Sequence, residues 1–476
     1  MLTLPPLKKL VLLAGDIAVF LVALFLAPLI RTGQLTPEIF QLYAFAAPFL
    51  ISLWVMGFIA FGLYDLRGAK NEPAFFERLA RAIASNFAIT IILFYFIPEF
   101  GFRPVVTLVI IFVMLALLSS AWRWLYNLRL AQRTRERILF LGITEEIIAL
   151  AQFLTANPQL GFTPTAFMGT ENGMELASRV TARNGMVFAP RENLKTIVKD
   201  QRINLIVIAH TLKQTTALAK ALFGVVPLGV TISQFPRFYE SVEGKVPISL
   251  INEAWFVENL IGQKRPRYEF AKRILDLLLV FLFGIILIVL LPVIALGILG
   301  STPQDVWNYR IRRARAGDGL IFFRQKRVGR NGALFDFIKF RSQVLGAERF
   351  GDEKEMSAAQ DPRCYPFGTL LRKTYLDELP QLWNVLKGEM SFVGPRPERL
   401  EFVNDLEKEI PFYRMRELVP PGITGWAQIN MQNDASVSDA PEKMQYDLYF
   451  IKNRSILLDL TILLKTALEV LQRSGR

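Results

Sequence analysis

The sequence predicts a membrane protein in three parts: an α-helical bundle with four membrane spans, a Rossmann-like α/β domain, and a C-terminal domain with a membrane-entering helix and a small β-hairpin. Of its 476 residues, 52% are hydrophobic, yet the formal net charge is +13. Soluble domains rarely combine these properties, whereas membrane proteins with a basic cytoplasmic surface do. The chain is too long to fold around a single hydrophobic core. Changes in composition along the sequence place the three parts at residues 1–130, 131–262 and 263–476.

Cysteine and histidine are almost absent. Cys364 and His210 are the only residues of their types, which excludes an intramolecular disulfide and a cysteine-based zinc site. The commonest general base is also nearly missing. Catalysis by this chain would have to use carboxylates, Lys, Arg, hydroxyls, or a hard oxygen-bound metal such as Mg²⁺.

Four apolar stretches fill the first part of the chain: Leu10–Ile30, Leu42–Leu63, Ala82–Ile97 and Val105–Tyr126. Crossing the hydrocarbon takes about 20 residues, and the third stretch is the shortest. The first is too long for a simple cleaved signal peptide. Basic residues crowd the segments before the first span, between the second and third, and after the fourth, whereas the other loops carry only Arg31 and Arg103. The bundle should therefore have both ends in the cytoplasm.

The middle part alternates between strand and helix patterns. RILFLG and INLIVIAH read as buried strands, and TEEIIALAQFL reads as a helix. A nucleotide-binding Rossmann turn would need G-x-G-x-x-G, but Gly142 is followed by Ile143, Thr144, Glu145 and Glu146, and two carboxylates repel a pyrophosphate. This favours a structural or oligomerising domain over a nucleotide-binding one. His210 is expected to be a core or strand-end residue.

A fifth apolar stretch, Leu277–Leu299, has clusters of Lys and Arg on both sides. A spanning helix would leave one cluster on the wrong side of the membrane. Pro292 also removes a helical hydrogen bond. We therefore expect residues 271–300 to enter the membrane, break near Pro292 and return to the same face. The alternative is an ordinary fifth span with a proline kink.

The remaining chain contains a hairpin pattern and a final amphipathic helix. IFFRQKRVGRNGALFDFIKF has two alternating strands around a Gly329–Gly332 turn. Its expected outward-facing cations are Arg324, Lys326, Arg327, Lys339 and Arg341. The helix ILLDLTILLKTALEVL could lie on the bilayer or pack in the core, and both readings stay open.

The segment LLRKTYLDELPQLWNVLKGEMSFVGPRP places two carboxylates among several cations. Pro380 is tolerated in a first helical turn, so a helix should begin near Asp377 and stop at Gly388. Its expected buried face is Leu379, Leu382, Trp383 and Leu386. In the structural interpretation, Asp377 is an N-cap and Glu378 interacts with the helix dipole.

The same residues suit phosphoryl transfer. An anion can bind at the helix N-terminus, where Arg372 and Lys373 add charge-assisted donors. Adjacent carboxylates can hold one Mg²⁺ together with phosphate oxygens, and one carboxylate can attack phosphorus. Arg396 lies between two prolines, on a backbone stiff enough to aim its guanidinium.

Several motifs carry a family resemblance: FFRQKRVGRNG, FDFIKFRS, LLRKTYLDELPQLWNVLKGEMSFVGPRPE, PPGITGWAQIN and YDLYFIKNRSILLDLTILLKT. They resemble the polyprenyl-phosphate glycosyl-1-phosphate transferases. The layout resembles the large monotopic sugar transferases that begin bacterial exopolysaccharide, O-antigen or capsule assembly. The specific match runs from about Arg265 to the C-terminus, and the upstream parts match in architecture only.

This resemblance implies transfer of a hexose-1-phosphate from a UDP-sugar to undecaprenyl phosphate, with release of UMP and a requirement for Mg²⁺. It implies an α-helical monotopic catalytic domain with a re-entrant helix on the cytoplasmic face of the bacterial inner membrane. The implied partners are UDP-hexose, undecaprenyl phosphate, the lipid bilayer and a second copy in a homodimer, with no nucleic acid.

The resemblance also implies residue roles. Asp377 would be the nucleophile and form an aspartyl-phosphosugar, Glu378 would be its metal-binding or proton-handling partner, and both would hold the metal. The implied phosphate- or substrate-binding cations are Lys339, Arg341, Arg372 and Arg396. The chain departs from the family pattern at Leu291, where many members have Ser before the proline, and in the basic segment NYRIRRARAGDG; neither departure touches the carboxylates.

Two functions of another class compete with this interpretation. One is a membrane-anchored nucleotide-sensing or scaffold protein without catalysis. The other is a transporter, which the near absence of intramembrane charge disfavours.

Overall fold

The computed structural model describes residues 6–34, 36–96, 105–130, 135–169, 186–189, 193–209, 216–251, 253–260, 265–302, 319–345, 347, 363–431 and 439–472. These residues form two compact units, Met1–Gly244 and Lys245–Arg476. The predicted boundary lay later, after residue 262. The difference arises because Val246, Phe256 and Leu260 are buried in the core of the second unit.

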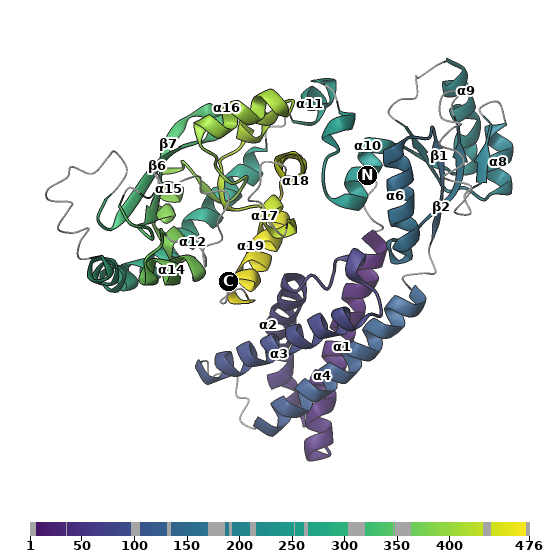
Figure 1. Ribbon diagram of the computed structural model, residues 1–476. Helices are drawn as coiled ribbons and strands as arrows, with labels where there is room; N and C mark the ends of the chain where they lie inside the picture. Colours follow the sequence, from purple (N-terminus) through teal and green to yellow (C-terminus); the bar gives the residue numbers. More distant parts are fainter. Residues whose placement is uncertain are drawn as a thin grey trace. The chain divides into compact units, whose positions relative to one another are not determined.

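Four helices form the membrane-type part of the first unit: α1 (Pro6–Thr32), α2 (Pro37–Ala60), α3 (Pro73–Phe96) and α4 (Val105–Leu125), which continues as a π-helical turn, Tyr126–Leu130. Helix α1 packs against α4 and α2, and α3 packs against α2 and α4 (Figure 1). Small and apolar side chains fill the contacts, including Leu24, Ala27 and Trp54.

Within the described ranges, three helical segments are long and apolar enough to cross a membrane: Lys8–Thr32, Val106–Arg129 and Pro266–Ser301. The first two agree with the predicted first and fourth spans. The predicted second span is represented by a shorter apolar segment, Ala44–Ala60. The predicted third span lies mostly in α3, which does not reach the same apolar length. The four-span arrangement therefore stays a prediction.

A buried ion pair joins α1 and α4. The Arg123 guanidinium donates to both carboxylate oxygens of Asp16, at 3.1 and 2.6 Å, and to the backbone oxygen of Leu63 at 2.6 Å. Arg123 is fully buried and Asp16 is 6% exposed. Two charges in such a place are tolerated because each compensates the other.

The second part of the first unit is a five-stranded parallel sheet of β1 (Glu136–Leu141), β2 (Phe162–Met168), β3 (Met186–Phe188), β4 (Leu205–Ile208) and β5 (Thr231–Gln234). The strand order is β3-β2-β1-β4-β5, which is the order of the first five strands of the classic doubly wound fold. Its helices are α6 (Glu145–Ala156), α8 (Leu194–Asp200), α9 (Thr216–Val225) and α10 (Phe235–Glu243) (Figure 1). The predicted strand–helix alternation is confirmed.

The turn after β1 explains the two carboxylates that follow Gly142. Thr144 caps α6 by accepting a hydrogen bond from the Ile147 backbone N–H, so Glu145 and Glu146 lie in the first turn, at the positive end of the helix dipole. Gly142 has φ +93°, and a Cβ there would lie 2.6 Å from Ala209. The glycine therefore serves close approach between neighbouring strands. His210 lies outside the described residues.

The second unit contains two short sheets among helices. The antiparallel hairpin is β6 (Phe322–Val328) and β7 (Leu334–Phe340), and β8 (Ser391–Val393) pairs in parallel with β9 (Gly422–Thr424). The helices are α11 (Glu253–Asn259), α12 (Pro266–Ser301), α14 (Pro366–Lys373), α15 (Leu382–Lys387), α16 (Leu400–Glu409), α17 (Trp426–Asn430), α18 (Ala440–Asn453) and α19 (Ile456–Gln472). The predicted hairpin and its turn are confirmed, with Asn331 and Gly332 at positive φ.

Helix α12 is the expected fifth apolar stretch. Helical structure continues through Pro292, whereas the sequence predicted a break there. Proline is tolerated inside membrane helices because neighbouring groups can satisfy the freed backbone carbonyl. The return of this helix to the same membrane face stays a prediction.

The expected buried face of α15 differs from the structure, and the final helix, for which two readings were left open, has one packed and one exposed face. In α15, Leu382 is buried, but Trp383 and Leu386 are 54% and 43% exposed. Helical spacing puts these two on the side opposite the core, together with Lys387. In α19, Ile462 is buried in the core while Leu457 is 72% exposed, so one face packs inward and another stays apolar and open.

We predict that Arg123→Met lowers the apparent Tm of the purified protein strongly, because Asp16 would remain buried without its partner. Removing one member of a buried pair costs about 3–5 kcal/mol. The matched control is Arg81→Met, since Arg81 forms an exposed pair with Glu77 whose side chain is 62% exposed. Such a pair contributes about 0–1 kcal/mol. Equal shifts in Tm for the two variants would contradict a stabilising role for the buried pair.

Candidate active site

The two neighbouring carboxylates lie in a tight turn between α14 and α15. The segment Leu376–Gln381 is a 3₁₀ helix, and Tyr375 precedes it with φ +54°. A left-handed conformation is uncommon for an aromatic residue and costs free energy. Asp377 lies inside the first turn, while Tyr375 occupies the cap position. The predicted capping role of Asp377 is therefore wrong, because the helix begins before it.

Both carboxylates face a lysine from the hairpin. Lys339 Nζ donates to Glu378 Oε1 at 2.8 Å and lies 3.7 Å from Asp377 Oδ2. Lys339 lies on the same face of β7 as the buried Phe337. The Lys339 ammonium group lies over the Phe337 ring, 5.4 Å from the ring centroid. The expected outward orientation of Lys339 is thus wrong: strand alternation puts it on the inner face.

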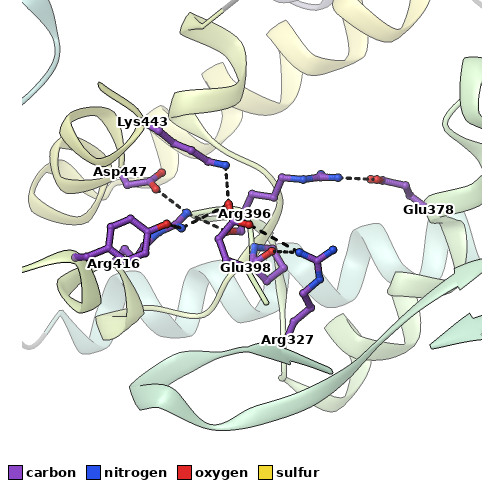
Figure 2. A network of polar contacts seen from close by, with 9 residues as sticks. Arg327, Glu378, Arg396, Glu398, Arg416, Lys443 and Asp447 are labelled. Carbon is purple, nitrogen blue, oxygen red and sulfur yellow. Dashed lines mark hydrogen bonds and ion pairs between the residues drawn. The ribbon is translucent and has the colours of Figure 1, made fainter. Parts of the chain in front are cut away.

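The second direct contact comes from the loop after β8. Arg396 Nη2 donates to Glu378 Oε1 at 3.3 Å, and Figure 2 shows the extended guanidinium pointing at this carboxylate. The Arg396 side chain is 32% exposed, whereas that of Glu378 is 14% exposed. A cation therefore reaches from the surface of the site to its buried acid.

The environment separates the acidities of the two carboxyl groups. Burial raises the pKa of Asp377 to about 6, with Lys339 opposing the rise and Glu378 adding to it. Burial also acts to raise the pKa of Glu378, but the ion pairs with Lys339 and Arg396 outweigh it and lower that pKa to about 2. Glu378 is thus the permanently ionised member of the pair, and Asp377 is the one near its titration point.

A buried amide that the sequence did not reveal fixes the hairpin against the carboxylates. Asn384 is fully buried, and its Nδ2 donates to the Asp336 backbone oxygen at 2.7 Å. Its Oδ1 accepts from the Ile338 N–H at 3.4 Å. These bonds tie α15 to β7 immediately before Lys339 and so set the position of the lysine.

The remaining expected site residues are placed differently. Arg372 Nη1 donates to Cys364 Sγ at 3.1 Å, and the Arg372 charge opposes the rise in the pKa of Asp377. Arg341 is 3% exposed, and its guanidinium donates to the Leu320 backbone oxygen at 2.9 Å and to Thr302 Oγ1 at 2.7 Å. Its expected outward orientation is wrong: Arg341 directly follows β7 and keeps the parity of Phe337 and Lys339, which is that of the inner face.

Behind Arg396 lies a second polar cluster, also missed from the sequence. It contains Arg327, Glu398, Arg416, Lys443 and Asp447 (Figure 2). The members come from four separate segments, so no local pattern reports their proximity. We call this set the Glu398 cluster.

The site can hold an anion and attack it. Arg396 and Lys339 supply positive charge at the surface, and Asp377 supplies a nucleophilic oxygen when ionised. Within the part of the chain that the structure describes, no group of three or more Asp, Glu, His or Cys residues could hold a metal. Two carboxylates alone nevertheless fit Mg²⁺, which commonly takes one or two carboxylates and completes its shell with substrate phosphate and water.

Comparison with known proteins places this site in a family. The model for bacterial sugar transferases matches residues 267–473. The exopolysaccharide production protein ExoY of Sinorhizobium fredii is 34% identical over 226 residues, which cover 45% of this chain and 91% of that protein. The chain belongs to the bacterial sugar transferase family. The carboxylates, Lys339 and Arg396 all lie within the matched segment.

Two longer relatives extend the similarity upstream. A UDP-N-acetylgalactosamine-undecaprenyl-phosphate N-acetylgalactosaminephosphotransferase of Aeromonas hydrophila is 34% identical over 248 residues, 52% of this chain and 53% of that protein. A UDP-glucose:undecaprenyl-phosphate glucose-1-phosphate transferase of Xanthomonas campestris pv. campestris is 29% identical over 348 residues, 71% of this chain and 66% of that protein. The matches thus span between half and two-thirds of these relatives. A CoA-binding domain model matches residues 59–233 of this chain, a range that includes most of the parallel sheet.

We predict that Asp377→Asn raises the apparent Tm near pH 7. In the wild type, Asp377 has a folded pKa near 6 and an unfolded pKa near 3.8, so the folded state binds more protons between these values. Stability from this group is therefore lost as pH rises through that window, by up to about 3 kcal/mol. The Asp377→Asn variant does not lose this stability because asparagine does not titrate. Its Tm should therefore exceed that of the wild type by an amount that grows from pH 4 to pH 7. In the wild type Glu378 titrates below this window, because its pKa is about 2. A difference in Tm between variant and wild type that stays constant or shrinks from pH 4 to pH 7 would contradict the raised pKa of Asp377.

Proposed function

We propose that this sugar transferase moves a hexose-1-phosphate from UDP-hexose to undecaprenyl phosphate and releases UMP, the first step of exopolysaccharide-type assembly. The observation that carries the proposal is the buried Asp377–Glu378 pair in contact with Lys339 and Arg396. The printed names of the Aeromonas and Xanthomonas relatives support the nucleotide-sugar and lipid-phosphate substrates. Those names differ in the sugar, so the proposal extends only to a hexose.

In the first half-reaction, an Asp377 carboxylate oxygen forms a bond to the β-phosphorus of UDP-hexose. The bond from this phosphorus to the bridging oxygen breaks, and UMP leaves with that oxygen. The Asp377 pKa near 6 leaves the carboxylate mostly ionised at neutral pH, while burial keeps it poorly solvated and reactive. The product on the protein is an aspartyl-phosphosugar.

In the second half-reaction, a phosphate oxygen of undecaprenyl phosphate bonds to the same phosphorus. The bond between Asp377 and phosphorus breaks, which returns the carboxylate and yields undecaprenyl diphosphohexose. No external oxidant, reductant or additional proton is required, because each step exchanges one phosphorus–oxygen bond for another. Splitting the transfer in this way avoids bringing two anionic substrates together at once.

The cations and Glu378 prepare the site for these steps. Lys339 and Arg396 can contact phosphate oxygens and stabilise the charge that develops during transfer. Glu378 stays ionised and holds both cations in position through its contacts at 2.8 and 3.3 Å. Asp377 and Glu378 would also hold Mg²⁺, which supplies charge neutralisation for the diphosphate.

Membrane association follows from α12. Near its start, Arg273 donates to the backbone oxygens of Val385 and Leu386, each at 2.7 Å. At its other end, Ile298 is buried and Thr302 Oγ1 accepts from Arg341. Both ends of the apolar helix thus contact the same unit, which supports a helix that enters and leaves the membrane on the cytoplasmic face.

Exposed apolar side chains of the second unit support the same placement. Those of α12 include Phe270, Phe281, Ile288 and Leu296, which are 70–73% exposed. Trp383 is 54% exposed, and Lys387 lies over its ring at 5.8 Å. An aromatic residue beside a cation suits the lipid headgroup region.

We predict that the purified protein releases UMP from a UDP-hexose only when undecaprenyl phosphate and Mg²⁺ are present, apart from a single stoichiometric burst without lipid. Asp377→Asn should abolish turnover, by at least about a thousandfold, because the nucleophile is lost. Lys339→Ala and Arg396→Ala should each slow it by about 10- to 100-fold, the effect of one charge-assisted hydrogen bond. Mass spectrometry after incubation without lipid should find hexose-phosphate on residue 377.

The matched control is Lys326→Ala. Lys326 is on the same hairpin but is 65% exposed and pairs with Asp336, so its loss should leave the rate unchanged. A wild-type protein that turns over without ever carrying the adduct on Asp377 would overturn the mechanism. No UMP release from any UDP-hexose would overturn the proposed function.

We predict cytoplasmic access at both ends of α12. In a Cys364→Ser background, Arg267→Cys and Ser301→Cys should react with a membrane-impermeant maleimide only after cells are permeabilised. Gln34→Cys, in the predicted periplasmic loop after α1, should react in intact cells and serves as the positive control. Labelling of Ser301→Cys in intact cells would instead establish a spanning helix.

A further inference from the structure

The loop that carries Arg396 is held along its whole backbone. Gly394 N–H donates to the Thr424 oxygen at 2.9 Å. The next four backbone oxygens each accept a hydrogen bond: Pro395 from Gly422 N at 2.9 Å, Arg396 from Arg416 Nη2 at 2.9 Å, Pro397 from Arg327 Nη1 at 3.2 Å, and Glu398 from Val328 N at 2.9 Å. Two of these donors are side chains, and both belong to the Glu398 cluster.

Arg416 has further contacts besides its hydrogen bond to the Arg396 backbone oxygen. It is 5% exposed, and its Nη1 donates to the Tyr413 hydroxyl at 2.6 Å. Its Nη2 lies 2.8 Å from Asp447, and its Nη1 lies 3.7 Å from Glu398. A buried guanidinium is costly unless its donors have partners, and here both terminal nitrogens, Nη1 and Nη2, have them. The direction of its bond to the Arg396 backbone oxygen is therefore set by the surrounding contacts.

Arg327 reaches the same loop from the hairpin. Its guanidinium lies over the Phe337 ring at 5.4 Å and 3.8 Å from Glu398. Since β6 carries Arg327 and β7 carries Lys339, one hairpin places a cation against the carboxylates and a second against the loop of Arg396. The hairpin therefore supports both sides of the anion site: the carboxylates with Lys339, and the loop with Arg396.

Glu398 keeps these cations together. Lys443 Nζ donates to its Oε1 at 2.8 Å, and Arg416 and Arg327 flank it (Figure 2). Burial opposes ionisation of Glu398, but its cationic neighbours outweigh this and lower its pKa to about 2. Glu398 therefore stays ionised throughout the physiological pH range.

We infer that Arg416, assisted by Arg327, is a positioning residue that fixes the backbone of Arg396 so that its guanidinium points at Glu378 and at the substrate phosphate. This inference rests on the proposed function for the identity of the substrate. Neither residue need touch the substrate: each acts by removing freedom from the loop, which lowers the ordering cost when the anion binds.

A purely structural role for the cluster makes a different prediction. Substitutions would then lower stability, and any effect on ligand affinity would be the same whether or not Arg396 is present. A positioning role requires the effect of Arg416 to pass through Arg396. A double-mutant cycle separates the two possibilities.

The experiment measures the dissociation constant of UDP for the full chain in lipid nanodiscs by isothermal titration calorimetry. Arg396→Gln should weaken UDP binding by about tenfold, the effect of one charge-assisted hydrogen bond. Arg416→Lys keeps the charge but loses the two-pronged donor, and it should weaken binding severalfold in the wild-type background. In the Arg396→Gln background it should change the affinity by less than about twofold.

Lys443→Met is the matched control. It removes a cation from the same cluster and contacts the Glu398 side chain rather than a loop backbone oxygen. It should lower the Tm, and any change in UDP affinity should be equal in the two backgrounds. Because Arg416→Lys could fail to fold, Arg327→Lys provides the same cycle at a position 15% exposed. Equal effects in both backgrounds for the folded variants would overturn the inference.

The affinity measurement separates this inference from the proposed function. Coupled effects on UDP binding without UMP release would retain the positioning role and overturn the transfer reaction. UMP release with additive effects on binding would retain the reaction and overturn the positioning role. Absence of UDP binding by the wild-type chain would overturn both.

Discussion

The contact between Lys339 and Glu378 is the interaction on which the candidate site depends. It joins the inner face of the hairpin to the 3₁₀ helix that carries both carboxylates, at 2.8 Å. Without this cation, two adjacent acidic groups in a largely buried turn would repel each other and one would remain protonated. The ion pair instead leaves Glu378 charged and concentrates the cost of burial on Asp377. The site is thereby made asymmetric, although the two acids are neighbours in sequence.

This asymmetry has a structural cost that the surrounding elements compensate. Tyr375 adopts a left-handed conformation, and Asn384 uses a fully buried amide to hold strand to helix. Each feature is unfavourable unless its neighbours determine it. These two features lie on either side of the carboxylates, so the conformation of the acidic turn depends on the contacts of the elements that flank it.

The sequence predicted much of this architecture, and its errors have physical causes. The hairpin turn was predictable because Asn331 and Gly332 suit positive φ. Lys339 and Arg341 were expected to face outward, but they have the parity of the buried Phe335 and Phe337, so strand alternation directs both inward. Arg416 and Asn384 were missed because their partners are distant in sequence, and periodicity does not indicate which polar side chains will be buried.

Helix α12 contacts the chain immediately before the Arg396 loop. Asp276 of α12 accepts hydrogen bonds from the Ser391 hydroxyl at 3.0 Å and from the Phe392 N–H at 3.1 Å. Strand β8 then runs directly into Gly394, where an added Cβ would lie 2.5 Å from the Pro420 backbone oxygen. The apolar helix α12 is thus linked through a few tightly packed residues to the guanidinium that contacts Glu378. If α12 enters the bilayer as proposed, a displacement of the helix in the lipid would be passed to the Arg396 loop through these contacts.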